Sequence, residues 1–160
     1  MKVGLDSSVL VASVKRVGEK SHAGAVELAT GIRKGGHQGV CSALVATELP
    51  GALLASTSMP IERVYEVQVS TLSAFRAALM SYEPYVAKTM DLMIEFRKLK
   101  SKWKIGSADF HHLATAVAEG CSIFVTTDER HLLRRETRAE LSKMLEITDP
   151  ASAAKAVASR

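Results

Sequence analysis

The sequence contains few aromatic residues, only two cysteines and no long run of apolar residues. Phe, Trp and Tyr together make up 5% of the 160 residues, which argues against a base-stacking platform as the main means of holding nucleic acid. The core must therefore be aliphatic. Because 47% of the residues are hydrophobic, as in ordinary globular proteins, the chain has enough apolar material to form one.

The two cysteines, Cys41 and Cys121, have no CxxC or Cys/His spacing that would hold zinc. We interpret both as buried reduced thiols, a use that fits a cytoplasmic protein. No segment approaches the ~20 apolar residues that a membrane span needs. Met1 and Lys2 lead directly into a strand pattern rather than into a signal peptide. We therefore expect a soluble, cytoplasmic protein with no membrane partner.

The charge of the chain is mildly basic, since 21 Lys and Arg residues against 17 Asp and Glu residues give a net charge of +4. This balance favours polyanionic partners only weakly, because many proteins without such partners share it. The distribution is more informative. Residues 97–104, RKLKSKWK, concentrate five basic residues around Trp103.

Short apolar segments alternate with helical patterns along the chain, which predicts an α/β fold with a mostly parallel sheet. We expect one domain over residues 1–160, with about 149–160 as a C-terminal tail or terminal helix. The predicted strands are 2–6, 38–42, 77–81, 122–126 and 144–148, and 77–81 has the weakest pattern. The predicted helices are 21–34, 60–75, 85–100 and 107–119, the last with Ser107 as its N-cap.

Four acidic residues are placed where this fold would bring them toward one edge of the sheet. Asp6 ends the first strand, and Asp128 follows the strand 122–126 by two residues. Strand carboxyl ends in a parallel sheet meet at one edge, where ligands usually bind. Asp109 lies in the first turn of the preceding helix. Glu48 lies six residues after Ser42, which predicts a position nearly two turns into the next helix.

Each acid also has a purely structural interpretation. Asp6 and Asp128 can cap the helices that follow them, Asp109 can interact with a helix dipole, and Glu48 can be a surface residue. Two carboxylates ~4 Å apart, however, repel by ~4 kcal/mol at an effective dielectric constant of ~20. A protein relieves this repulsion by protonating one acid or by binding a cation. Carboxylates with hydroxyl neighbours suit Mg²⁺ or Mn²⁺.

Four motifs together resemble the PIN-domain nucleases, and most closely their VapC-like toxin branch. The resemblance runs from residue 1 to about residue 148. Its third and fourth motifs are the most specific, because an Asp followed by a His-Leu-Ala-Thr-Ala helix, a Gly, a strand and Thr-x-Asp is not expected by chance. The motifs are VGLDSSVLVA, SALVATELPG, IGSADFHHLATAVAEG and FVTTDERHL.

The resemblance implies an α/β/α sandwich with a parallel sheet of four or five strands. It implies a Mg²⁺- or Mn²⁺-dependent endoribonuclease acting on RNA, often the toxin of a type II toxin–antitoxin pair. The metal-binding and catalytic residues would be Asp6, Glu48, Asp109 and Asp128. Ser8 and Thr126 match small polar positions that support such a site, although Ser8 stands where Asn is more usual. The apolar faces of helices 60–75 and 85–100 suggest a homodimer or an antitoxin groove.

Several basic residues are candidates for holding the RNA at the rim of an acidic site. Lys102, Trp103 and Lys104 precede the Asp109 motif and combine phosphate contacts with one stacking ring. Arg130 belongs to a second basic group beside Asp128. The alternative is a solvated helix end, where lysines are favourable in any case.

Two local features carry further expectations. Pro50 follows Glu48 closely, so we expect the helix to kink or restart there. His111 and His112 are adjacent and must face different directions on their helix, and we expect one of them to be a core or interface residue.

Other classes fit the sequence less well. A phosphatase of the haloacid dehalogenase type needs a second Asp two residues after the first, and that position is Ser8. A receiver domain needs an acidic pair near the first strand, where this sequence has the single Asp6. The remaining alternative is a PIN-like RNA- or protein-binding module without catalysis. The presence of all four acids argues against it.

Overall fold

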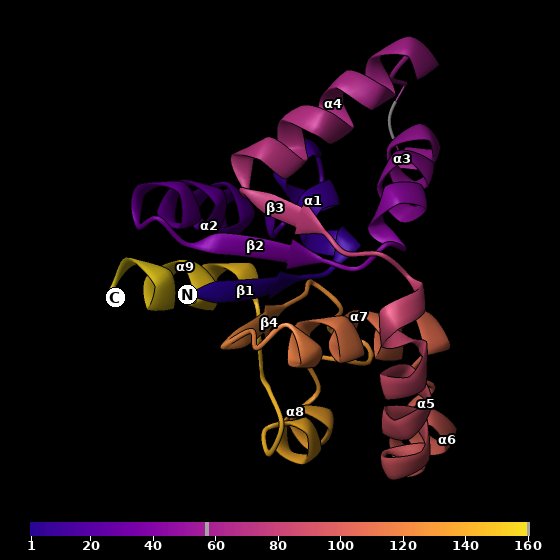
Figure 1. The fold of residues 1–160 in the computed structure, drawn as a ribbon. Helices are drawn as coiled ribbons and strands as arrows, with labels where there is room; N and C mark the ends of the chain where they lie inside the picture. Colours follow the sequence, from indigo (N-terminus) through magenta and orange to yellow (C-terminus); the bar gives the residue numbers. More distant parts are fainter. Residues whose placement is uncertain (57, 160) are drawn as a thin grey trace.

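A five-stranded, fully parallel sheet forms the centre of the protein in a computed structural model that describes residues 1–56 and 58–159 (Figure 1). The strand order is β3-β2-β1-β4-β5, so β1 is the middle strand. All five predicted strands are confirmed, including the weakest. They are β1 (Lys2–Leu5), β2 (Gln38–Cys41), β3 (Ala77–Leu79), β4 (Ile123–Val125) and β5 (Glu146–Thr148).

Helices cover both faces of this sheet, which confirms the α/β/α architecture. The alternation along the strands separates two cores, since Val3 and Ile123 pack on one side whereas Phe124 packs on the other. The first core receives α1 (Ser7–Val14), α2 (His22–Lys34), α3 (Val45–Ser56), α4 (Ile61–Ala74) and α9 (Pro150–Ala158). The second receives α5 (Val86–Glu95), α6 (Arg97–Trp103), α7 (Ser107–Ala118) and α8 (Arg135–Leu141).

The helix α7 lies very close to the sheet because β1 has a glycine beneath it. A Cβ added to Gly4 would lie 2.7 Å from Cβ of Ala116 and 2.9 Å from Cδ2 of Phe124. This close approach fixes the helix that carries Asp109 against the middle strand, which ends at Asp6.

The predicted helix 85–100 is not continuous. A short 3-10 helix, η1 (Glu83–Tyr85), precedes α5, and the chain turns at Phe96 before α6 begins. Leu92, Phe96 and Leu99 are all buried in the second core. The turn brings these side chains onto one core, a requirement that the helical spacing alone did not reveal.

The start of α3 differs from the prediction, and the helix does not restart at Pro50. Since α3 begins at Val45, Glu48 lies in its first turn rather than nearly two turns in. The helix neither ends nor restarts at Pro50. Proline removes the N–H that would pair with the carbonyl of Ala46, and the side chain of Gln68 on α4 donates to that carbonyl instead, at 3.2 Å.

Near the C-terminus, α9 packs along α2, where Gly24 allows the backbone at Ala151 to come close. Asp149 caps α9 by accepting a hydrogen bond from the backbone N–H of Ser152 at 2.9 Å. Both cysteines are buried free thiols. Within the described ranges, no helix combines the length and apolar character needed to cross a membrane.

Candidate active site at the carboxyl edge of the sheet

Asp6 lies at the end of the middle strand and is only 7% exposed. It occupies the N-cap position of α1, yet its side chain makes no capping hydrogen bond. Its carboxylate instead accepts hydrogen bonds from hydroxyl groups. The donors are Thr126 at 2.6 Å and Ser8 at 2.8 Å, both to Oδ2, and Ser7 at 3.3 Å to Oδ1. The capping interpretation of the Asp6 side chain is therefore wrong.

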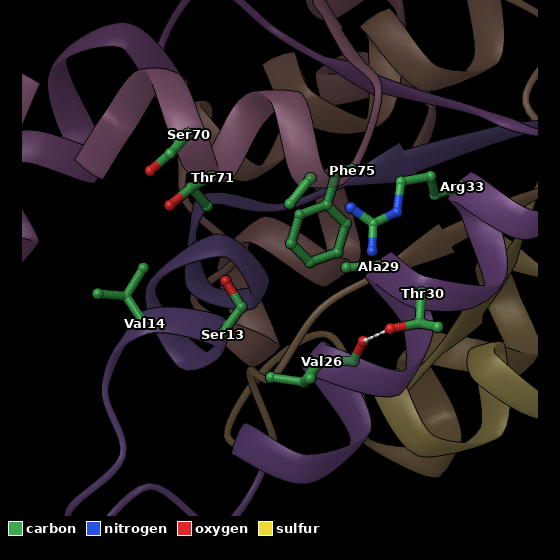
Figure 2. Close-up of a pocket in the computed structure, with 10 residues that line it drawn as sticks. Ser13, Val14, Val26, Ala29, Thr30, Arg33, Ser70, Thr71 and Phe75 are labelled. Carbon is green, nitrogen blue, oxygen red and sulfur yellow. Dashed lines mark hydrogen bonds between the residues drawn. The ribbon is translucent and has the colours of Figure 1, made fainter. Parts of the chain in front are cut away.

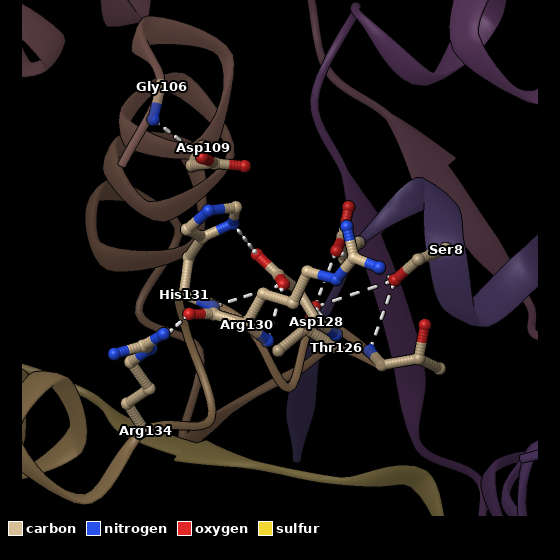
Figure 3. Close-up of polar contacts among 10 residues, drawn as sticks. Ser8, Gly106, Asp109, Thr126, Asp128, Arg130, His131 and Arg134 are labelled. Carbon is tan, nitrogen blue, oxygen red and sulfur yellow. Dashed lines mark hydrogen bonds and ion pairs between the residues drawn. The ribbon is translucent and has the colours of Figure 1, made fainter. Parts of the chain in front are cut away.

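Thr126 and Ser8 connect Asp6 to the loop after β4. Figure 3 shows Ser8 and Thr126 close to Asp128 of that loop. The hydroxyl of the buried Thr126 also accepts from the backbone N–H of Asp128 at 3.1 Å. The hydroxyl of Ser8 accepts from the backbone N–H of Thr127, likewise at 3.1 Å. The two hydroxyls thus fix the loop and the carboxylate relative to each other.

Replacing Thr126 by valine is expected to destabilise the protein by roughly 2 kcal/mol, a fall in Tm of about 4–8 °C. The isosteric change leaves the N–H of Asp128 without an acceptor and Asp6 without its shortest donor. Thermal unfolding tests this. Thr137→Val is the matched control, because the Thr137 hydroxyl is buried and has no hydrogen-bond partner among the described residues. Equal effects of the two substitutions would refute the assignment.

Asp128 uses both of its carboxylate oxygens within its own loop. Oδ1 accepts from the backbone N–H groups of Arg130 and His131 at 3.0 and 3.1 Å. Oδ2 lies 3.0 Å from Nδ1 of His131 (Figure 3). The residues after Asp128 form turns, and the next helix, α8, begins only at Arg135. Asp128 therefore caps a turn, and a metal ion would have to compete with His131 for Oδ2.

Asp109 lies in the first turn of α7, whose N-cap is Gly106, one residue before the predicted cap Ser107. Oδ2 of Asp109 accepts from the N–H of Gly106 at 2.7 Å. Burial raises the pKa of Asp109 most strongly, and the charges of Asp6 and Asp128 raise it further, against the lowering effect of the Gly106 hydrogen bond. Three of the predicted acids therefore share one electrostatic environment.

Asp109→Asn is expected to stabilise the metal-free protein at neutral pH by about 3 °C in Tm. The folded-state pKa of Asp109 is raised, so wild-type folding loses stability as the pH rises through that value. Below about pH 3 the residue is protonated in both states, and the gain should vanish. Unfolding curves in EDTA across this range test the prediction, and a gain that is independent of pH would contradict it.

Glu48 approaches the same region from α3 and is held by a histidine. Nε2 of His112 lies 2.9 Å from Oε2 of Glu48. This hydrogen bond is the main reason why the pKa of Glu48 is lowered, and the hydroxyl of Ser7 contributes in the same direction. Burial lowers the pKa of His112, but Glu48 and the charges of Asp6 and Asp109 outweigh burial and raise it. The structure thus joins Glu48 to the other acids through Ser7 and His112.

The donor chemistry of this site fits a hard divalent cation. Its side chains offer carboxylate and hydroxyl oxygens, and such a cation prefers oxygen ligands. Within residues 1–56 and 58–159, no lysine or arginine nitrogen lies within 4.0 Å of any of the four acids. The side chains are not placed as a finished metal cage, however, because the described part of the chain contains no group of three His, Cys, Asp or Glu residues that could hold an ion. Each acid is held instead by its own donor.

The predicted RNA-binding residues lie in two different surroundings. The Trp103 ring is half-buried, with Nζ of Lys102 4.9 Å and Cζ of Arg134 5.0 Å from its centroid. A base would have to displace one of these cations to stack there. Lys104 is exposed after α6, and Arg130 is exposed in the Asp128 loop.

Sequence reasoning named Ser8 and Thr126, which hold Asp6, but it missed the partners of Glu48 and Asp128. Both His111 and His112 are buried, where only one was expected to be, and His112 contacts Glu48 and Ser42. His131 was not singled out, although its position three residues after Asp128 in a turn was a usable signal. No local signal pointed to Ser42, because its partner His112 is distant in the sequence.

The fold and the acidic site define a parallel α/β protein of the kind that binds ligands at the carboxyl ends of its strands. The family follows from comparison with known proteins. The family model for the PIN domain matches residues 3–138, so the chain belongs to the PIN domain family. PIN domains are generally nucleases that use divalent metal ions. A search of curated proteins finds no match to this chain.

Proposed function

We propose that this protein is a divalent-metal-dependent endoribonuclease that cleaves RNA phosphodiester bonds, with Mg²⁺ or Mn²⁺ as its cofactor. One observation carries the proposal. Asp6 is buried at the end of the middle strand and accepts hydrogen bonds from hydroxyl donors, and no lysine or arginine nitrogen of the described residues lies within 4.0 Å of its carboxylate. A buried carboxylate in that setting, close to further acids, calls for a cation.

In this proposal Asp6, Asp109 and Asp128 hold the metal ion, and Glu48 either joins them or orients the attacking water. When bound, a divalent ion would lower the pKa of a water molecule and provide a positive charge next to the phosphodiester. The hydroxyls of Ser8 and Thr126 keep the Asp6 carboxylate in one orientation. Asp109 and Asp128 must move from their present hydrogen-bonded positions to share an ion with Asp6.

The RNA would be drawn to this acidic site by basic residues at its rim. Arg130 is exposed, and its own backbone N–H is hydrogen-bonded to Asp128, which places it beside the site. Lys102 and Lys104 flank Trp103 near the start of the segment that leads to Asp109. Phosphate contacts of this kind make binding dependent on salt concentration.

We further propose that the protein is a VapC-like toxin in the cytoplasm, forming one PIN-like domain over residues 1–160 with a cognate antitoxin as partner. A cavity of about 280 Å³ between α1, α2 and α4 is a candidate contact for that partner (Figure 2). Apolar side chains such as Val14 and Phe75 line it, and Arg33 stands beside them. Within the described chain no carboxylate pairs with Arg33, so an acidic, apolar segment would complement it.

A homodimer is proposed from the apolar side chains that α4 and α5 leave exposed. On α5, Val86, Met90 and Ile94 follow one another at intervals of four residues, and Ile94 is 68% exposed. Ile61 and Tyr65 repeat this spacing on α4. Exposed apolar residues that repeat along one helix face are typical of protein–protein interfaces.

The second candidate is a PIN-like RNA- or protein-binding module without catalysis. The observation in its favour is that no three potential ligands in the described chain are grouped tightly enough to hold an ion. The two candidates differ in their response to metal, because only the nuclease requires it.

The test is to incubate the purified protein, free of any bound partner, with a mixed pool of structured RNAs in Mg²⁺, in Mn²⁺ and in EDTA. Sequencing of the fragments is expected to reveal defined cuts that EDTA abolishes. Calorimetry with each metal is performed in parallel. A folded protein that cuts no RNA and binds neither metal would establish the binding module as the better account. Metal binding without cuts would indicate that the pool lacks the target.

A further inference from the structure

Two hydrogen bonds through the buried ring of His112 lead from the end of β2 to Glu48. The hydroxyl of Ser42 lies 2.8 Å from Nδ1 of His112, and Nε2 of the same ring lies 2.9 Å from Oε2 of Glu48. Ser42 follows β2, Glu48 lies on α3, and His112 lies on α7. The loop after β2 and the next helix, α3, thus meet one imidazole ring of the distant helix α7.

The direction of these hydrogen bonds follows from their chemistry. An ionised carboxylate only accepts, so Nε2 of His112 carries the proton that it shares with Glu48. In the neutral ring Nδ1 is then an acceptor, and the Ser42 hydroxyl donates to it. Oγ of Ser42 also accepts from the N–H of Leu44 at 3.3 Å. The serine therefore fixes the plane of the ring and, in the neutral form, its tautomer.

The exposure of Ser42, His112 and Glu48 shows which of these three residues can contact a substrate. Ser42 is 2% exposed and His112 is 3% exposed, so neither reaches an RNA phosphate. Glu48 is partly exposed, with 33% of its side chain accessible. The hydrogen bond holds Oε2, whereas Oε1 makes no hydrogen bond to the histidine. The buried pair therefore acts only through the orientation of Glu48.

The same helix also fixes a second acid. Asp109 and His112 are three residues apart on α7, and residues at this spacing lie on the same helix face. Gly106 holds Asp109 by its backbone N–H, while His112 holds Glu48 across the gap to α3. Because Gly4 lets α7 pack tightly on the middle strand, the position of this helix sets both carboxylates relative to Asp6.

We propose that His112, backed by Ser42, is a positioning residue that holds Glu48 in a single orientation toward the reacting phosphodiester. The proposal rests on the nuclease function proposed above. A glutamate without such a partner has three freely rotating side-chain bonds, and ordering them would oppose every catalytic cycle. Because the buried ring orients Glu48 before the RNA binds, this loss of side-chain entropy does not occur during the reaction.

A double-mutant cycle between His112 and Glu48 tests the proposal through cleavage kinetics. His112→Leu is expected to lower kcat about 10- to 100-fold with little change in KM, the range typical of partners that orient active-site ligands. Glu48→Ala should lower it at least as much. If His112 acts only through Glu48, the double variant is no slower than Glu48→Ala. The proposal is overturned if the losses of kcat caused by the two single substitutions multiply in the double variant.

Milder variants guard against loss of the fold. His112→Gln keeps a donor near the position of Nε2 and should retain more activity than His112→Leu. The kcat of Ser42→Ala should lie between those of the wild type and of His112→Leu. Unfolding temperatures are measured for every variant. Equal activity of His112→Gln and His112→Leu at equal stability would contradict a positioning role.

A spectroscopic measurement separates this proposal from the nuclease proposal. In ¹⁵N-labelled protein, the Nε2–H proton of His112 should exchange slowly, Nδ1 should show an acceptor shift, and Glu48→Ala should abolish the slow exchange. Adding Mg²⁺ should shift the Nε2–H resonance, since Glu48 faces the site. Calorimetric Mg²⁺ binding without any such shift would overturn the positioning role. A protein that shows the slow exchange and loses it in Glu48→Ala, but binds no Mg²⁺ and cuts no RNA, would refute only the nuclease function.

Discussion

Asp6→Asn is expected to reduce metal-dependent RNA cleavage about 1000-fold while leaving the protein folded. The substitution removes the charge at the end of the middle strand, where Asp6 is buried among hydroxyl donors. A metal ion contributes several kcal/mol to stabilising charge in a phosphodiester cleavage, and each 1.36 kcal/mol changes the rate tenfold. Initial cleavage rates in Mg²⁺ and Mn²⁺ measure the effect.

The fold should tolerate this change because asparagine has the same size as aspartate. Its amide oxygen can still accept from Thr126 or Ser8, so we expect the Tm to stay within about 5 °C of the wild type. Calorimetry should show weaker metal binding in the same variant. Undiminished cleavage by a folded Asp6→Asn protein would remove Asp6 from the catalytic site.

Glu129→Gln is the matched control for Asp6→Asn. This substitution also removes one negative charge, and Glu129 lies in the same loop as Asp128. Unlike Asp6, Glu129 is exposed, and it pairs with Lys20 at 2.6 Å. An exposed pair of this kind contributes little to stability. We therefore expect near-normal cleavage and metal affinity. A comparable loss in both variants would indicate a general charge effect rather than a metal site.

Gly4→Val is expected to produce the largest loss of stability among the substitutions considered, about 3 kcal/mol or a fall in Tm of roughly 6–12 °C. Its Cβ would lie 2.7 Å from Cβ of Ala116 and 2.9 Å from Cδ2 of Phe124. Neither contact is with the end of a flexible chain, so α7 must move away from β1. Thermal and urea unfolding both measure the change.

The displacement of α7 should also reduce activity, because the helix carries Asp109 and His112. Gly51→Val provides the comparison. Gly51 lies in α3, and a Cβ added there meets no atom within 4 Å. Valine is slightly better than glycine in a helix, so the Tm should change by no more than about 2 °C. Equal losses at the two positions would show that α7 does not depend on the absence of a side chain at Gly4.

The sequence by itself determined the fold class and which acids lie at the strand ends. Apolar strands that alternate with helices require a parallel sheet, because each crossover returns the chain in the same direction. In such a sheet the end of β1 at Asp6 and the loop after β4 at Asp128 must share an edge. These conclusions depend only on local periodicity and on topology, which the sequence encodes directly.

Local patterns failed where neighbours from the tertiary structure set the geometry. The break at Phe96 occurs inside a regular helical spacing, because the second core requires the chain to turn there. The continuity of α3 through Pro50 depends on Gln68 of α4, which replaces the missing hydrogen bond. Neither partner can be identified from the residues beside the break or the proline.

Only the tertiary structure decided how the acids are held. Thr126 donates to Asp6 across 120 positions of sequence, and His112 reaches Glu48 across 64. Sequence motifs list such residues without saying which pairs touch, since a hydrogen bond depends on distances of a few tenths of an ångström. The sequence thus determined that acids gather at one edge of the sheet. The packing of α7 and of the loop after β4 decided their orientation, because those partners come from elements that meet only in the folded chain.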